Sequence, residues 1–175
     1  MDVGVHYVHG LRLLMGEPES VVASRAKQIY TEMSGEDSVQ LLFSSNAGWE
    51  AHMLLSWASD RGHLPDLVVL GERGTLHLWP GTSFLDYYPA SPRLMSRLVS
   101  YVRSGWLQEK LMRPTWQRIR VRVCGENGYE GEMREFLSAV MNEREPALLP
   151  EEGRRDLEVV VRSYEALELG TRVVI

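Results

Sequence analysis

The stretch MDVGVHYVHGLR, residues 1–12, decides how the rest of this chain is interpreted. Asp2 and His6 are four residues apart and His9 follows three residues later, a spacing that places side chains on one face of a helix. Gly4 lies between them and would leave a low spot on that face. A carboxylate beside an imidazole can transfer protons, hold a metal or hydrogen-bond a polyol. The stretch therefore predicts a helix that carries a candidate site.

The same spacing fits two other interpretations. An Asp–His pair near a helix start can be an N-terminal charge beside a solvated imidazole. Asp2, His6 and His9 also form a candidate two-histidine, one-carboxylate set for zinc or iron, although three ligands within two turns of one helix would make a strained site. Spacing alone leaves these interpretations open. It favours an N-terminal charge beside a solvated imidazole over any functional role.

Composition limits the classes of protein to consider. The chain has 175 residues, 44% of them apolar and 25% charged, which suits a globular domain with a sizeable core. A net charge of −5 argues against a general nucleic-acid binder or a polybasic membrane-surface protein. Cys124 is the only cysteine, which excludes an internal disulfide and indicates a reducing compartment. With no apolar run near the ~20 residues of a membrane-spanning helix and no signal-peptide layout, we expect a cytoplasmic protein.

Periodicity predicts helices at both ends of the chain and strands in the middle. The first helix covers residues 2–15 and stops at Gly16, with Val5, Val8, Leu11 and Leu14 as its apolar stripe. Strands are predicted at residues 20–30, 38–43, 49–57, 66–70, 75–79, 83–88 and 117–124. Inward positions of the first strand would be Val21, Ala23, Ile29 and Tyr30. Residues 91–116 suggest a helix after Pro92.

The last third of the chain is predicted to be helical. In residues 128–142 the apolar side chains repeat at helical spacing. A second helix starts at Pro150 and stops at Gly170, and its predicted buried stripe consists of Leu157, Val160, Val161, Tyr164 and Leu167. A terminal strand can follow at residues 172–175.

This order indicates an α+β fold: a mostly antiparallel, open-faced sheet with helices packed on one face, in a single domain over residues 1–175. Several apolar strand residues would then need a cover, which predicts self-association through the sheet. They are Trp49, Met53, Leu55, Trp57, Leu76, Leu78 and Trp79. Arg118, Arg120 and Arg122 alternate with apolar residues, so they form either an anion-binding stripe or, by preference, a solvated strand face.

Several chemical motifs are missing. The sequence has no G-x-G-x-x-G and no Walker A loop, so it lacks a nucleotide-phosphate cradle of either type. It also has no G-x-S-x-G, no H-E-x-x-H and no paired C-x-x-C.

Four blocks of sequence resemble one family in the same order. The opening D-x-G-x-H (Asp2, Gly4, His6), continuing as HYVHGLRLLMGEPESVVA, is similar to the start of the C-terminal domain of the Gfo/Idh/MocA family, the dehydrogenases related to glucose–fructose oxidoreductase and inositol dehydrogenase. The later blocks are the hairpin DLVVLGERGTLHLW, the helix pair GYEGEMREFLSAVMNEREPALLPEEGRRDLEVVVRSYEAL and the terminal strand TRVVI. They cover most of the chain, with residues 91–116 the weakest part.

This resemblance implies a fold and roles for individual residues. The implied fold is an open-faced α+β domain, like the C-terminal domain of glyceraldehyde-3-phosphate dehydrogenase, that follows a Rossmann domain and commonly forms the oligomer interface. His6 would be the general acid/base, Asp2 would orient substrate and tune His6, Gly4 would allow close approach, and His9 would contact substrate where many members have an aspartate. NAD or NADP and the catalytic lysine would belong to the Rossmann domain, which this sequence lacks.

The main functional hypothesis is therefore the substrate-binding and oligomerisation domain of an NAD(P)-dependent oxidoreductase acting on a sugar, cyclitol or related hydroxyl or carbonyl compound. The resemblance implies that such a domain is inactive alone and works with a Rossmann domain upstream or in trans. The alternative is a non-catalytic ligand-binding or scaffold module that retains the fold. A small metalloenzyme using Asp2, His6 and His9 is a third hypothesis.

Overall fold

The computed structural model describes residues 4–58, 65–79, 84–90, 118–122 and 128–175. Within these ranges the elements confirm the predicted α+β class. The elements are α1 (Gly4–Met15), β1 (Ser20–Arg25), β2 (Ser38–Ser44), β3 (Glu50–Ser56), β4 (Leu67–Gly71), β5 (Gly74–Leu78), β6 (Phe84–Pro89), β7 (Ile119–Arg122), α4 (Gly128–Met141), α5 (Pro150–Leu169) and β8 (Val173–Val174). The helix predicted after Pro92 lies outside the described residues.

The chain divides into two compact units. The first consists of Met1–Ser59 and Arg134–Ile175, and the second of Asp60–Met133. Each contains one four-stranded antiparallel sheet, ordered β3-β2-β1-β8 in the first unit and β4-β5-β6-β7 in the second. The division does not test the single domain expected over residues 1–175, which stays a prediction.

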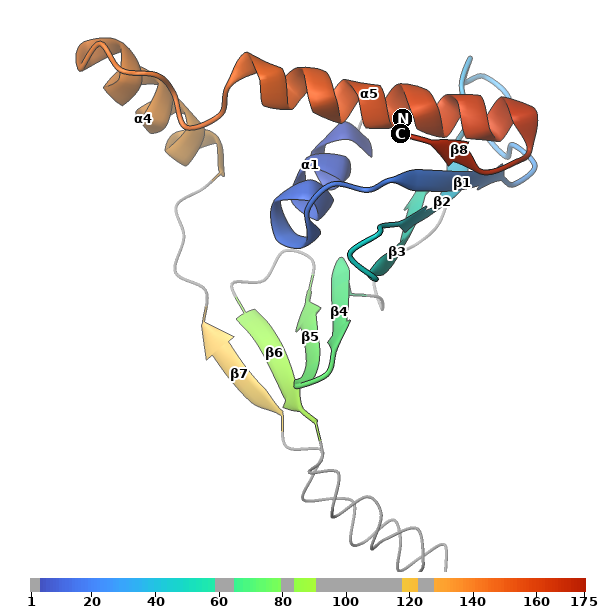
Figure 1. Cartoon of the computed structure of the whole chain (residues 1–175), viewed down its shortest axis with the longest axis horizontal. Helices are drawn as coiled ribbons and strands as arrows, with labels where there is room; N and C mark the ends of the chain where they lie inside the picture. The colour runs from blue at the N-terminus through green and yellow to red at the C-terminus, as the bar shows by residue number, and fades with distance from the viewer. Residues whose placement is uncertain (1–3, 59–64, 80–83, 91–117, 123–127) are drawn as a thin grey trace, which may run out of the picture. The chain divides into compact units, whose positions relative to one another are not determined.

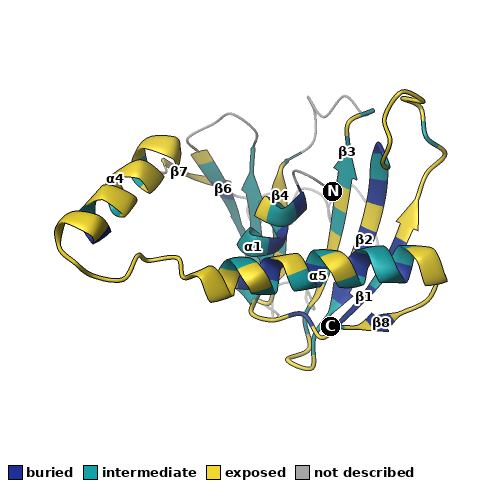
Figure 2. Cartoon of the chain, turned by 90° about the horizontal axis from the view of Figure 1, so that it is seen from above, coloured by how far each residue is buried: buried dark blue, intermediate teal, exposed yellow. Residues whose placement is uncertain are grey.

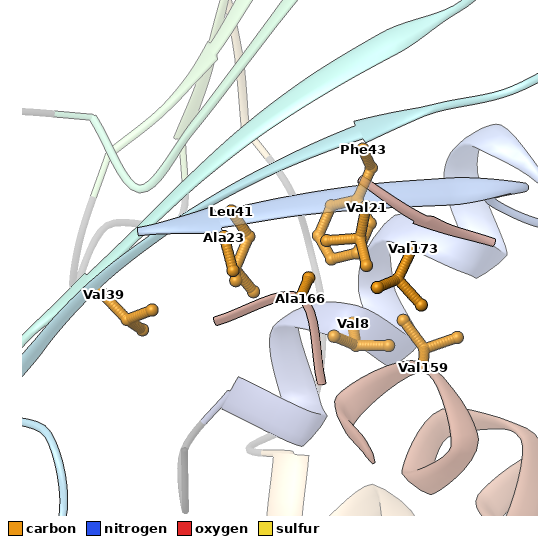
Figure 3. Packing of buried hydrophobic residues seen from close by; sticks show 9 residues of the cluster. All are labelled: Val8, Val21, Ala23, Val39, Leu41, Phe43, Val159, Ala166 and Val173. Carbon is orange, nitrogen blue, oxygen red and sulfur yellow. The ribbon is translucent and has the colours of Figure 1, made fainter. Parts of the chain in front are cut away.

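In the first unit, α1 and α5 lie on the same side of the β3-β2-β1-β8 sheet (Figure 1). Alternation along β2 explains which face they cover: Val39, Leu41 and Phe43 are buried, whereas Leu42 between them is 42% exposed. The buried strand residues meet Val8 of α1 and Val159 and Ala166 of α5 in one apolar cluster (Figure 3). This core fixes α1, the helix that carries the candidate site, against the sheet.

The predicted first strand is too long. β1 ends at Arg25, where its last partner is Val39, and Ile29 and Tyr30 are 67% and 50% exposed, not inward. The buried carboxylate of Asp37 accepts the backbone N–H groups of both residues, at 2.5 and 2.8 Å. The backbone amides of Ile29 and Tyr30 therefore bind a side chain in a turn and do not extend the sheet ladder.

Both predicted helix stripes on the core side need correction. On α5 the buried residues are Asp156, Val159, Ser163 and Ala166, while Leu157 and Val161 are 57% and 62% exposed. Val160 and Leu167 of the predicted stripe are partly buried and pack against the core cluster, and buried and exposed residues alternate along α5 in Figure 2. On α1 the predicted Leu14 is 60% exposed, and Arg12 is buried instead.

The ends of α5 agree with the prediction. Pro150 occupies the first turn with Glu151 and Glu152, and Gly170 ends the helix in the left-handed conformation at φ 64°, donating its N–H to the Ala166 carbonyl at 2.9 Å. In α4, by contrast, Ala139 is the only buried residue, and the helix is almost entirely exposed in Figure 2. The apolar residues of α4 that repeat at helical spacing, including Tyr129 and Phe136, are 83% and 58% exposed.

In the second unit the predicted hairpin between β4 and β5 is confirmed, and its turn needs glycine. Gly74 has a φ of 146°, and a Cβ atom there would overlap the carbonyl oxygen of Tyr88. The arginine row is exposed, as a solvated strand face would be. In addition, Arg120 is ion-paired to buried Asp86 at 2.7 Å, with Arg118 3.8 Å from the same carboxylate.

The predicted cover for the sheet also changes. Trp49, Met53 and Leu55 pack, partly buried, against the core cluster on the helix side of the first sheet. The face of that sheet away from the helices presents Leu42 and Leu54, 42% and 47% exposed. No described helix is long and apolar enough to span a membrane.

Candidate active site on helix α1

Helix α1 sorts the candidate site residues onto different faces. Its buried stripe is Gly4, Val8 and Arg12, spaced four residues apart. His6 points to the exposed side of the helix and His9 is partly buried at its flank. Asp2 lies outside the described residues, so its predicted place beside His6 stays a prediction. Because Gly4 is buried, the low spot expected between the site residues faces the interior.

The helix ends where the sequence predicts. Gly16 adopts a φ of 85° and donates its N–H to the Arg12 carbonyl at 2.8 Å, which satisfies one of the last free carbonyls of the helix. The following Pro18 is fully buried and leads into β1. This short connection fixes the C-terminal end of α1 next to the sheet.

Arg12 is the centre of an ion-pair network between α1 and α5. Its side chain is 5% exposed and donates to both carboxylate oxygens of Glu17, to the side chain and backbone carbonyl of Glu152, and to Asp156. The Nη1–Oδ1 distance to Asp156 is 2.5 Å and the Nη2–Oε2 distance to Glu152 is 2.9 Å. A buried guanidinium with this many acceptors is well compensated, so it ties the two helices together.

The network also reaches His9. Its Nδ1 lies 2.9 Å from Oδ2 of Asp156, whose side chain is 6% exposed, while the His9 side chain is 34% exposed. Asp156 therefore bridges Arg12 and His9, one through each carboxylate oxygen. Because an ionised carboxylate only accepts hydrogen bonds, Nδ1 of His9 is the donor.

Within this network, Arg12 and Glu17 shift each other's pKa. Its hydrogen bond to Arg12 holds the pKa of the Glu17 carboxyl below its usual value, helped by Arg155, whose Nε lies 3.1 Å from Oε2. The same contact with Glu17 raises the pKa of Arg12, against the opposing effect of burial. Arg12 and Glu17 thus stay charged.

These contacts define what the α1 surface can do chemically. An exposed imidazole, His6, can exchange protons with a bound molecule, and a second imidazole, His9, is held in a fixed position one turn away. Among the described residues no group of three His, Cys, Asp or Glu side chains could hold a metal ion. That finding leaves the set of Asp2, His6 and His9 untested, because Asp2 is not described.

Sequence reasoning missed the supporting residues Arg12, Glu17, Glu152 and Asp156. Two signals were available: an arginine among the apolar positions of the first helix, and an aspartate flanked by the apolar positions of the last one. Neither signal names its partner, because 144 positions separate Arg12 from Asp156 along the chain.

A comparison with protein families confirms the resemblance. Residues 1–77 match the model described as "GFO/IDH/MocA C-terminal domain". No curated protein sequence matches the chain.

Solved structures share the fold. They include aldose-aldose oxidoreductase from Caulobacter crescentus complexed with glycerol, with a TM-score of 0.73 and 17% identity over 98% of this chain and 46% of that one. WlbA dehydrogenase from Chromobacterium violaceum, in complex with NADH and UDP-GlcNAcA, has a TM-score of 0.68 and 19% identity over 100% and 45% of the two chains. An oxidoreductase from Agrobacterium radiobacter, in complex with NAD+, L-tartaric acid and magnesium, has a TM-score of 0.66 and 19% identity over 99% and 48%. The chain spans about half the length of these proteins.

Proposed function

We propose that this chain, whose residues 1–77 match the GFO/IDH/MocA C-terminal domain, is the substrate-binding and oligomerisation domain of an NAD(P)-dependent oxidoreductase. The substrate class is a sugar, cyclitol or related hydroxyl or carbonyl compound. The observation that carries the proposal is the exposed position of His6 on α1, a helix that Arg12 locks to α5. Solved structures that share this fold are oxidoreductases and a dehydrogenase, which supports the reaction class.

Each candidate residue has one role in the proposal. His6 is the general acid/base at the substrate hydroxyl or carbonyl, and its exposure leaves the imidazole accessible to a ligand. Asp2 orients substrate and tunes His6, and His9 contacts substrate. The close approach expected at Gly4 stays a prediction, because Gly4 is buried on the inner side of α1. Of these roles, that of His9 has the strongest structural support, because Asp156 fixes its ring.

The residues of this chain do not fit a nicotinamide dinucleotide. The described strand pairs are all antiparallel, whereas the dinucleotide-binding fold is a parallel sheet with a glycine-rich turn before a helix. A Rossmann domain, joined to this chain or supplied in trans, would hold NAD or NADP and supply the catalytic lysine. The isolated chain is therefore expected to be inactive.

Two further parts of the proposal concern assembly and location. Exposed Leu42 and Leu54 on the face of the first sheet away from the helices support self-association through that face. Sedimentation of the isolated chain tests this, and a monomer at all concentrations would contradict it. A single cysteine suits a reducing compartment, which supports the cytoplasm as the location.

The decisive experiment measures turnover after the chain is joined to a dinucleotide-binding domain. His6→Ala is expected to lower kcat by about 10²–10⁴-fold, the usual contribution of a general acid/base, with folding unchanged because the side chain is exposed. Lys27→Ala is the control, since this side chain is also exposed but lies in the loop after β1, away from α1. Equal turnover in both variants would favour the scaffold alternative.

A further inference from the structure

The hydrogen bond between His9 and Asp156 fixes the state of the imidazole. A neutral imidazole carries one N–H, and the carboxylate oxygen 2.9 Å away requires it on Nδ1. The lone pair then resides on Nε2, to which no described residue is hydrogen-bonded. The ring is therefore prepared to accept a hydrogen bond at Nε2 from a ligand hydroxyl.

Arg12 occupies one oxygen of the Asp156 carboxylate. Its Nη1 donates to Oδ1 of Asp156 at 2.5 Å, so only Oδ2 remains for His9. Both Asp156 and Arg12 are nearly fully buried, at 6% and 5% exposure, and their helices pack against each other. A carboxylate held in this way controls both the tautomer and the orientation of a histidine.

We propose that Asp156 is a positioning residue that holds His9 as the Nδ1–H tautomer, so that Nε2 accepts a hydrogen bond from a hydroxyl group of the substrate. This inference rests on the proposed function, because it places His9 on the substrate-binding face of α1. It adds that α5, about 150 residues away in sequence, takes part in substrate recognition through a chain of contacts from Arg12 to Asp156 to His9.

The first test measures the tautomer of His9 in the wild-type chain. Two-bond ¹H–¹⁵N spectra of the intact chain distinguish a protonated from an unprotonated ring nitrogen in each of the five histidines, with the His9 signals identified by their loss in His9→Gln. In its neutral form, His9 is expected as the Nδ1–H tautomer. A predominant Nε2–H tautomer, or an equal mixture, would overturn the inference.

Asp156→Asn gives a second, directional test. The Arg12 guanidinium only donates, so the amide oxygen of Asn is expected to turn toward Arg12 and its NH₂ group toward His9. His9 must then accept at Nδ1, and its proton moves to Nε2. Glu165→Gln is the matched control: it makes the same acid-to-amide change on α5 at a residue paired with Arg162, outside the contacts of Arg12, and should leave the tautomer of His9 unchanged.

Ligand binding is then measured with three probes: D-glucose, myo-inositol and D-gluconate. A probe that binds the wild-type chain, seen as shifts of the His6 and His9 signals, is expected to bind His9→Ala about 3–10-fold more weakly, the loss of roughly one hydrogen bond. Glu165→Gln should bind as the wild type does. Equal affinity of His9→Ala and wild type would overturn the substrate contact at Nε2.

The outcomes separate this inference from the proposed function. If no probe shifts either histidine in the wild type, the substrate-binding function fails and the contact at Nε2 fails with it, whatever the tautomer of His9. If a probe binds but the tautomer is wrong, the function stands and the role of Asp156 is rejected. Should Asp156→Asn not fold, the wild-type tautomer and the probe titrations of His9→Ala still decide, because His9→Ala removes the Nε2 acceptor.

Discussion

The two units of this protein are stabilised in different ways. Every buried hydrophobic residue that the structure describes lies in the first unit, whereas in the second the one buried residue among those described is Asp86. That carboxylate accepts from Arg120 and from the indole N–H of Trp79, and the Arg120 contact holds its pKa below the usual value. The candidate site lies on the unit with the apolar core, where a helix can be held rigidly.

Neighbouring leucines on β2 offer the largest test of this difference. Leu41→Ala should lower the free energy of unfolding by about 3–5 kcal/mol, because it removes a fully buried side chain and leaves a cavity in the core of the first unit. Leu42→Ala removes the same atoms from a side chain that is 42% exposed and should cost less than about 1 kcal/mol. Urea unfolding followed by circular dichroism measures both. Equal decreases in the free energy of unfolding would mean that the two faces of the sheet are equally buried.

A glycine substitution tests the second unit separately. Gly74→Ala should cost about 2–3 kcal/mol, since it combines an unfavourable φ with overlap against the Tyr88 carbonyl. Gly48→Ala is the control in the first unit: its φ of 85° is also positive, but nothing lies within 4 Å of the added Cβ, so about 1 kcal/mol is expected.

Hydrogen exchange locates these effects. Gly74→Ala should accelerate exchange of the β5 and β6 amides and leave those of β1 and β2 unchanged. Faster exchange across both sheets would contradict the division into two units.

The smallest predicted effect is the pH dependence from Glu17. Its pKa in the folded chain is lowered by Arg12, so its contribution to stability is present above the ordinary carboxyl range and is lost as the pH falls through the lowered value. Glu17→Gln should lower the free energy of unfolding at pH 7 by less than about 1 kcal/mol, because the Glu17 side chain is 50% exposed.

The slope with pH provides the check. The free energy of unfolding, measured with urea between pH 6 and pH 3, should fall more steeply with decreasing pH in the wild type than in Glu17→Gln. High salt should reduce the difference, because exposed charges are screened. Equal pH slopes of the two proteins would show that the contact between Glu17 and Arg12 does not contribute to stability.

Local signals predicted the element order well and the inward faces less well. Pro150, Gly170 and Gly16 fix helix ends through their own backbone geometry, so the sequence places those ends without knowledge of partners. In the predicted stripe of α5, Val160 and Leu167 do pack partly buried against the core, whereas Leu157 and Val161 are exposed, because periodicity alone does not fix the rotation of a helix about its axis. Close packing on β1 selected Val159, Ser163 and Ala166.

The candidate site shows the same division. His6 and His9 were found from spacing on one helix, because i to i+3 proximity depends only on helix geometry. Asp156 was not found, since its contact with His9 spans 147 positions and exists only when α5 packs on α1.

The sequence by itself determined the α+β class, the strand pairs joined by short turns, the ends of α1 and α5, and the family resemblance that the match over residues 1–77 confirms. Only the tertiary structure decided that Arg12 is the buried centre of an ion-pair network and that Asp156 fixes the ring of His9. The physical reason is the range of the interactions: caps, turns and periodicity act between residues close in sequence. Buried ion pairs and core contacts instead join segments that only the folded chain brings together.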